Sequence, residues 1–168
     1  MKHLVDYANS HIVRSFDYLL MSTHYGNYQK NRAGFEKLFR GLSDSKWDEA
    51  IDIIKHVTKR GGTMKFEHPK SLKASTTHEF QEIQSVAKAL DMEKELALKG
   101  FDVHREASQR SNNKHDPEIS SYIEKEFVHG HAHTIRKLAG YVSDLNSMLR
   151  ESDRALSLFL FDEYLQKE

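Results

Sequence analysis

The 168-residue sequence contains no cysteine, only two prolines and only eight glycines. The lack of cysteine excludes disulfides, thiolate metal sites and cysteine catalysis within these residues, but it does not distinguish a reducing compartment from secretion. No apolar run approaches the ~20 residues of a membrane span. The opening MKHLVDYANS also lacks the apolar segment of a signal peptide. From these residues we therefore expect no membrane partner, and a cytoplasmic location stays open.

An excess of charge of either sign is missing as well, because Lys plus Arg and Asp plus Glu number 25 each. A balanced chain generates no strong field that would attract nucleic acid or an acidic membrane surface. We therefore expect no nucleic-acid partner. The length suits one domain whose core needs no cross-links, and we expect residues 1–168 to form it.

Long stretches of helical periodicity take up most of the chain. Gly61 and Gly62 follow the second stretch as a helix end, and Asp116 with Pro117 opens the fourth as N-cap and first helical residue. The segment 61–77 lacks periodicity and is predicted to be a crossover. Two short connections and one long one predict an all-α four-helix bundle with a long crossover and a short fifth C-terminal helix. The predicted helices span about 5–25, 33–59, 78–108, 116–149 and 155–165.

Each long helix carries a polar side chain on the face predicted to be buried. A single such group is usually satisfied by a partner in the core, but four helices with polar groups at similar depth predict a shared site. The predicted apolar stripes and their polar members are Leu4, Ala8, Ser15 and Tyr18 with His11; Phe35, Leu38, Phe39, Leu42, Ala50, Ile53, Ile54 and Val57 with Lys46 and Glu49; Ile83, Val86, Leu90, Ala97 and Phe101 with Glu93; and Ile123, Phe127, Leu138 and Leu145 with His131.

Four-helix bundles can hold two iron ions with a Glu from each of two helices and Glu-x-x-His from the others. Here Lys46-Trp47-Asp48-Glu49 stands where Glu-x-x-His would be expected, and His11 and His131 replace oxygen donors. A lysine ammonium has no lone pair to offer a metal. We interpret the site as vestigial and non-catalytic, with Lys46 in the place of iron and paired with Glu93.

Two other classes of function stay open on these residues. One is a working di-iron ferroxidase that uses Glu49, Glu93, His11 and His131. The other is a metal-free helical bundle, such as a carrier or signalling protein. The run HGHAH at 129–133 does not add a three-ligand zinc site, because only its first and last histidines share a helical face; a surface pair that binds metal adventitiously is the simpler interpretation.

Several motifs resemble ferritin, and most closely the light-chain homologue of secreted insect ferritins. The motifs cover nearly the whole chain and occur in the family's order. The resemblance implies a shell of twenty-four subunits, homomeric or shared with a heavy chain, that stores iron as a ferric mineral. It also places the heavy chain's ferroxidase centre at His11, Lys46, Glu49, Glu93 and His131. The motifs are SFDYLLMSTHYGNYQKNRAGFEKLF (15–39), IDIIKHVTKRGG (51–62), AKALDMEKELA (87–97), HDPEISSYIEKEF (115–127), IRKLAG (135–140) and LFDEYLQK (160–167).

The resemblance implies further roles on the shell surface. Asp44 and Asp48 match cavity-facing carboxylates at which ferric mineral nucleates, and carboxylate oxygens suit ferric iron. A plain solvated acidic face is the alternative. Glu124 keeps the carboxylate of the three-fold channel, whereas Ser121 stands where an Asp is usual, so ions are expected to pass through channels of another subunit type.

The resemblance also implies a role for the fifth helix and a cellular compartment. Leu156, Leu160 and Tyr164 share one face of the fifth helix and would line a four-fold contact; on a monomer the same stripe would be an exposed liability. Kinship implies the secretory pathway, although the insect subunits carry a secretion signal and a cysteine-containing extension that these 168 residues do not include.

Overall fold

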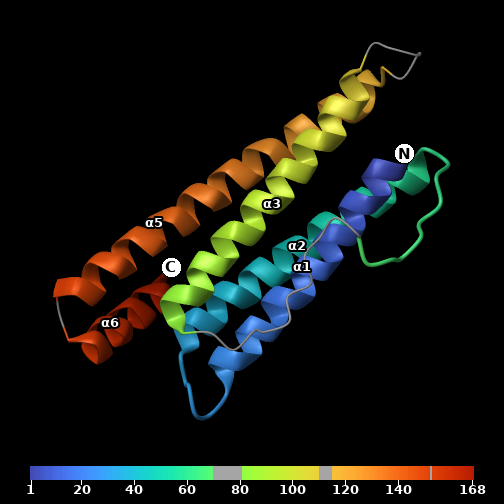
Figure 1. Ribbon diagram of the computed structural model, residues 1–168. Helices are drawn as coiled ribbons and strands as arrows, with labels where there is room; N and C mark the ends of the chain where they lie inside the picture. Colours follow the sequence, from blue (N-terminus) through green and yellow to red (C-terminus); the bar gives the residue numbers. More distant parts are fainter. Residues whose placement is uncertain (70–80, 110–114, 152) are drawn as a thin grey trace.

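The computed structural model describes residues 1–69, 81–109, 115–151 and 153–168, and every regular element in these ranges is helical (Figure 1). No helix in these ranges has both the length and the apolarity needed to cross a bilayer. The predicted all-α class is confirmed. The elements are α1 (Lys2–Gly26), α2 (Ala33–Lys59), α3 (Glu82–Ser108), α4 (Pro117–Ile123), the π-helical η2 (Glu124–Val128), α5 (His129–Glu151) and α6 (Arg154–Lys167).

Two helical hairpins form the bundle, and α6 closes one end of it (Figure 1). Helices α1 and α2 pack together, α3 packs along α5, and α6 contacts both α2 and α5. After α2 the chain continues without helix through residues 61–69, as predicted for the start of the crossover. The rest of the predicted crossover, and the predicted start of the third helix at 78, lie outside the described residues.

The predicted helix boundaries rest on backbone chemistry that the structure shows. Gly61 has φ +75, a value that favours glycine, and the Gly62 N–H donates to the carbonyl of Val57. At the other boundary the Asp116 carboxylate accepts a hydrogen bond from the Ile119 N–H, with Pro117 as the first helical residue. Helix α2 thus ends at Lys59 and α4 begins at Pro117, as predicted.

The fourth long helix differs from the prediction because it is not α-helical throughout. Residues 124–128 form a π-helix between α4 and α5. The wider i→i+5 turn brings side chains four apart into line. Ile123, Phe127 and His131 are accordingly all buried. The π-turn thus aims His131 at the bundle interior.

Apolar side chains fill the bundle in two clusters on either side of its middle. One contains Tyr18, Phe35 and Leu145, and the other contains Leu4, Ile53 and Phe127. The prediction that Phe101 belongs to the core is wrong, since its side chain is 49% exposed. The buried stripe of α3 instead passes through Gly100, where an added Cβ would lie 3.1 Å from the Tyr7 hydroxyl, so the Tyr7 ring packs directly against α3 at this position.

Candidate functional site: the polar cluster at the bundle centre

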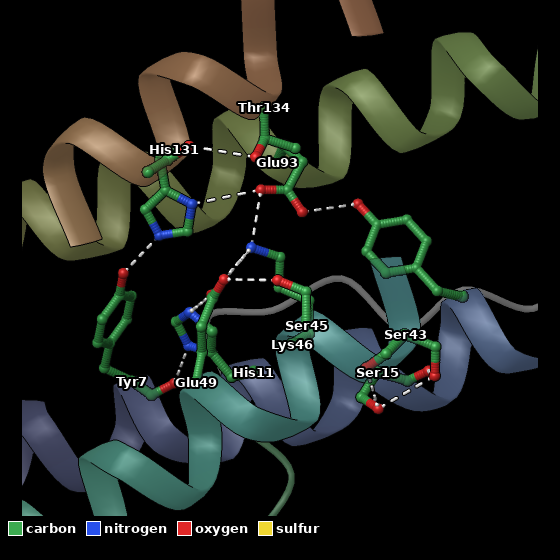
Figure 2. Close-up of polar contacts among 12 residues, drawn as sticks. Tyr7, His11, Ser15, Ser43, Ser45, Lys46, Glu49, Glu93, His131 and Thr134 are labelled. Carbon is green, nitrogen blue, oxygen red and sulfur yellow. Dashed lines mark hydrogen bonds and ion pairs between the residues drawn. The ribbon is translucent and has the colours of Figure 1, made fainter. Parts of the chain in front are cut away.

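Five polar side chains from facing helices converge inside the bundle, as Figure 2 shows. We call His11, Lys46, Glu49, Glu93 and His131 the polar cluster; they come from α1, α2, α3 and α5. The helical periodicity predicted that these residues point inward, and the structure brings all five together. The exposed fractions are 0% for His11 and Glu93, 2% for Lys46 and 3% for His131, while the Glu49 side chain is 28% exposed.

The Lys46 ammonium lies between the two carboxylates. Its Nζ donates to Glu49 at 3.0 Å (Oε1) and 2.9 Å (Oε2) and lies 3.2 Å from Glu93 Oε2. The predicted pairing of Lys46 with Glu93 across the bundle is therefore present, and Glu49 shares the same cation. The ammonium is the one fixed positive charge among these five residues.

Both ring nitrogens of His131 have a polar partner. Its Nδ1 lies 3.3 Å from Glu93 Oε2, and its Nε2 lies 2.6 Å from the Tyr7 hydroxyl. Because a carboxylate only accepts hydrogen bonds, we assign the ring proton to Nδ1, so that Nε2 accepts from Tyr7. The other Glu93 oxygen accepts from the Tyr18 hydroxyl at 3.0 Å.

Tyr7 is the member of this network that the sequence analysis missed. It lies four residues before His11, on the same face of α1, and its ring contacts the His11 ring edge-on with centroids 4.4 Å apart. That spacing was a usable signal. A tyrosine on a core stripe nevertheless looks like ordinary packing until its hydroxyl partner on another helix is known.

His11 places a lone pair opposite a carboxylate. Its Nδ1 is 3.0 Å from the backbone carbonyl of Tyr7, which requires the proton on Nδ1. Its Nε2 lies 3.1 Å from Glu49 Oε2 but makes no hydrogen bond within the described residues. Burial lowers the pKa of His11 more than the nearby Glu49 raises it. The ring is thus favoured in its neutral form.

Both carboxylates of the cluster are stabilised as anions. Burial alone would raise the pKa of Glu49, but the adjacent His11 ring, in the protonated form that it takes in acid, and the Lys46 charge lower it to about 2. Burial likewise opposes ionisation of Glu93, and the hydrogen bond from His131 together with the Lys46 charge lowers its pKa below the usual value. At neutral pH the cluster therefore holds two carboxylates around one ammonium.

This arrangement does not fit a pair of iron ions. His11, Glu49 and His131 offer ligand atoms within 4.8 Å of one another, the one such group among the described residues. However, Glu49 Oε2 is already bound to Lys46, and the ammonium also contacts Glu93. An added cation would face a fixed positive charge and would have to displace it from both carboxylates.

The other predicted site residues lie away from the polar cluster. Asp44 and Asp48 are exposed on α2, and the Asp44 carboxylate lies 3.2 Å from Arg40 Nε. Glu124 is exposed in η2. His129 and His133 are also exposed while His131 is buried, as predicted for a run that is not a three-ligand cluster.

A bundle of four long helices with converging polar groups at its centre defines a ferritin-like protein, and comparison with known proteins agrees. The ferritin-like domain family matches residues 1–148. The ferritin light chain of Trichoplusia ni is 51% identical over 167 residues, covering 96% of this chain and 72% of the relative. The ferritin light chain of Drosophila melanogaster is 45% identical, covering 96% and 74%.

Solved structures give the same result. The crystal structure of Trichoplusia ni secreted ferritin matches with a TM-score of 0.91 at 50% identity, covering 98% of this chain and 81% of that one. The chain therefore belongs to the ferritin family, the family of iron-storage subunits, and the two insect relatives named above are ferritin light chains.

Proposed function

We propose that this chain is a light-type ferritin subunit without ferroxidase activity, in which residues 1–168 form one domain of a shell that stores ferric mineral. Light-chain relatives support the type. The chain would assemble with a ferroxidase-bearing heavy chain, which oxidises ferrous iron and delivers it to the shared cavity. By likeness to a secreted ferritin, it would act in the secretory pathway or outside the cell.

The position of Lys46 Nζ carries the argument against catalysis. The ammonium lies 3.2 Å from Glu93 Oε2 and 2.9 Å from Glu49 Oε2, which is where a ferroxidase would need a metal ion between carboxylates. The remaining donors are two histidines whose nitrogens face Glu49, Glu93 and Tyr7. Four protein donors, two of them bound to an ammonium, are a poor ligand set for two metals.

Rapid mixing of the purified chain with ferrous iron tests this proposal. The expected rate of oxidation equals that of the Glu49→Gln/Glu93→Gln variant, which removes both cluster carboxylates. A heavy chain mixed in the same way provides the positive reference. Oxidation by the parent clearly above the rate of the carboxylate-free variant would instead favour the working ferroxidase.

The outer surface of α6 supports assembly. Leu156, Leu160 and Tyr164 are 53%, 50% and 47% exposed, and Phe159 beside them is 53% exposed. Exposed apolar side chains gathered on one helix mark a contact with another molecule. Size exclusion with and without a heavy chain separates a shell from a 19.5 kDa monomer, and a monomer under both conditions would favour the metal-free carrier.

For the mineral surface we propose that Asp44 and Asp48 help nucleation on the cavity wall, with Asp48 contributing more. The Asp44 carboxylate pairs with Arg40, whereas the Asp48 carboxylate makes no hydrogen bond or ion pair with the described residues. Asp48→Ala should slow mineral growth in mixed shells more than Asp44→Ala, with the initial oxidation rate unchanged. Asp91→Ala, an exposed aspartate on α3, is the control; equal growth in all variants would leave only a solvated acidic face.

For the channel, we propose that Glu124 contributes to cation passage. Its side chain is exposed on η2, so a carboxylate is available at the surface. Glu124→Gln should slow iron uptake into mixed shells when this chain is in excess over the heavy chain. Uptake that does not change with Glu124→Gln would place the channels entirely on the partner subunit.

A further inference from the structure

Helix α6 is apolar on two opposite faces. Leu158, Phe161 and Leu165 are buried against the bundle, whereas Leu156, Phe159, Leu160 and Tyr164 point outward and are about half exposed. A helix that is apolar all round is normally buried all round. The outer face is therefore complete only when a second molecule covers it, and the direction in which α6 is held decides where that face points.

A single carboxylate joins α6 to the start of α2. Asp162 Oδ1 accepts hydrogen bonds from the backbone N–H groups of Gly34 at 2.9 Å and Phe35 at 3.1 Å. The first amides of a helix have no acceptor within the helix, and Arg32, the N-cap residue of α2, provides no side-chain cap. Asp162 therefore caps α2 from another helix, and its 5% exposure keeps water from replacing it.

Gly34 lets the two helices approach this closely. A Cβ at Gly34 would lie 2.1 Å from the backbone carbonyl oxygen of Asp162 and 2.9 Å from the Leu165 Cβ. The first of these obstacles is backbone, which cannot turn aside as a flexible side chain would. Any side chain at position 34 would push α6 away from α2.

The C-terminal end of α6, one turn beyond Asp162, is capped in return by α2. Lys37 Nζ donates to the backbone carbonyl of Gln166 at 3.0 Å, one of the last carbonyls of α6, which lack intrahelical donors and attract positive charge. Helices α2 and α6 thus satisfy each other's terminal groups. This fixes both the position and the direction of α6.

We infer that Asp162 and Gly34 form a latch that sets the direction of α6 and so determines which apolar face the subunit presents to neighbouring copies. The inference rests on the proposed function, because the neighbouring copies are subunits of the shell. Asp162 and Gly34 act here as positioning residues. Neither needs to touch the neighbouring subunit itself.

Amide hydrogen exchange combined with native mass spectrometry of the full chain tests the latch. Asp162→Ala should speed exchange of the Gly34 and Phe35 amides on the order of tenfold, as expected when a cap is lost, and should reduce the shell fraction. Asp162→Asn, whose amide oxygen can still accept both bonds, should restore most of the protection and of the assembly. Asp162→Asn thereby separates hydrogen bonding from charge.

The chain offers a matched control in Asp153→Ala. Asp153 caps the start of α6 itself through the Ala155 and Leu156 N–H groups, so its loss removes a carboxylate and a cap from α6 but leaves the contact with α2. Asp153→Ala should keep the α2 amides protected. Gly34→Ala should disrupt assembly although alanine is the better helix former, because the added Cβ meets Asp162.

Each measurement has a result that overturns the latch. Unchanged exchange at Gly34 and Phe35 in Asp162→Ala would show that Asp162 does not cap α2. Shells that form in full yield despite rapid exchange would show that the cap does not govern assembly, as would equal loss of assembly in Asp153→Ala. Failure of the parent chain to assemble with or without a heavy chain would instead contradict the proposed function, while the exchange experiment would still report on the cap.

Discussion

The core contains two buried cations, Lys46 and Arg14, whose carboxylate partners differ in how far they are exposed to solvent. Lys46 and Arg14 each have side chains 2% exposed and each contact two carboxylates. Lys46 lies at the bundle centre, whereas Arg14 joins α1 to α3 at the flank. The partners of Lys46 are Glu93, 0% exposed, and Glu49, 28% exposed; those of Arg14 are Asp17, 9% exposed, and Glu95, 31% exposed.

Because the two cations are equally buried, we expect the burial of their anions to decide how much each ion pair contributes to stability. If Arg14 is removed, Glu95 lies close enough to the surface to regain water. If Lys46 is removed, Glu93 keeps only the hydrogen bonds from Tyr18 and His131, with no positive charge to offset its own. A buried ion pair adds little over an apolar filling, but breaking one is severely destabilising.

Removing Lys46 should therefore have the largest effect on stability. We expect Lys46→Ala to lower the free energy of unfolding by about 3–5 kcal/mol, since it strands the buried Glu93 carboxylate and leaves a cavity. Urea unfolding followed by circular dichroism measures the change. A Lys46→Ala variant as stable as the parent would refute the claim that the ammonium neutralises Glu93.

A double-mutant cycle sharpens the same point. Lys46→Met fills the space without the charge, and Glu93→Leu then removes the stranded anion. We expect Lys46→Met/Glu93→Leu to recover much of the loss of Lys46→Met, because two apolar side chains can replace a buried ion pair. Additive losses in the cycle would mean that the two charges do not interact in the folded protein.

Restoring ligands should convert the centre from a salt bridge to a metal site. The triple variant His11→Glu, Lys46→Glu and Glu49→His recreates Glu-x-x-His on α2 and adds a carboxylate on α1, beside Glu93 and His131. We expect it to bind iron and to lose metal-free stability from the added negative charge. Metal content after desalting, with Lys46→Glu alone as control, checks this; a triple variant without bound metal would argue against a vestigial di-iron site.

The sequence predicted which side chains are buried better than it predicted their partners. Periodicity within each helix placed His11, Lys46 and Glu93 inward, and the glycine and proline signals placed the helix ends. Which side chains meet between two helices depends on the rotation and register of one helix relative to the other. The apolar stripe of a single helix specifies neither. For that reason the Tyr7 hydroxyl on His131 was missed, and so was the carboxylate of Asp162, hidden in an apolar run.

Acid should weaken the polar cluster in two stages. Burial lowers the pKa of His11 below its usual 6.5, so the unfolded chain binds this proton more readily and stability falls as pH drops below about 6.5. The pKa of Glu49, lowered to about 2 from 4.5, gives a second loss between about pH 4.5 and 2 in the same direction, and Glu93 adds to it.

Unfolding free energies measured from pH 7.5 to 3 test the two stages. His11→Gln should flatten the slope that begins below about pH 6.5, and Glu49→Gln should flatten the slope below about pH 4.5, because each variant removes the group that titrates there. A parent and a His11→Gln variant with parallel profiles from pH 7.5 down to about pH 4.5, where Glu49 begins to titrate in the unfolded chain, would show that His11 does not contribute to the first stage.

The smallest effect is expected at the second cation. Arg14→Met, matched to Lys46→Met in shape and in lost charge, should lower the unfolding free energy by only about 1–2 kcal/mol, between the values for exposed and fully buried pairs. The reason is that Glu95 can turn toward water once the guanidinium is gone, and that Arg14 Nε already makes no hydrogen bond within the described residues. The same urea titration measures both variants side by side. If Arg14→Met proved as damaging as Lys46→Met, burial of the cation would matter as much as burial of its partner, and the contrast between centre and flank would not hold.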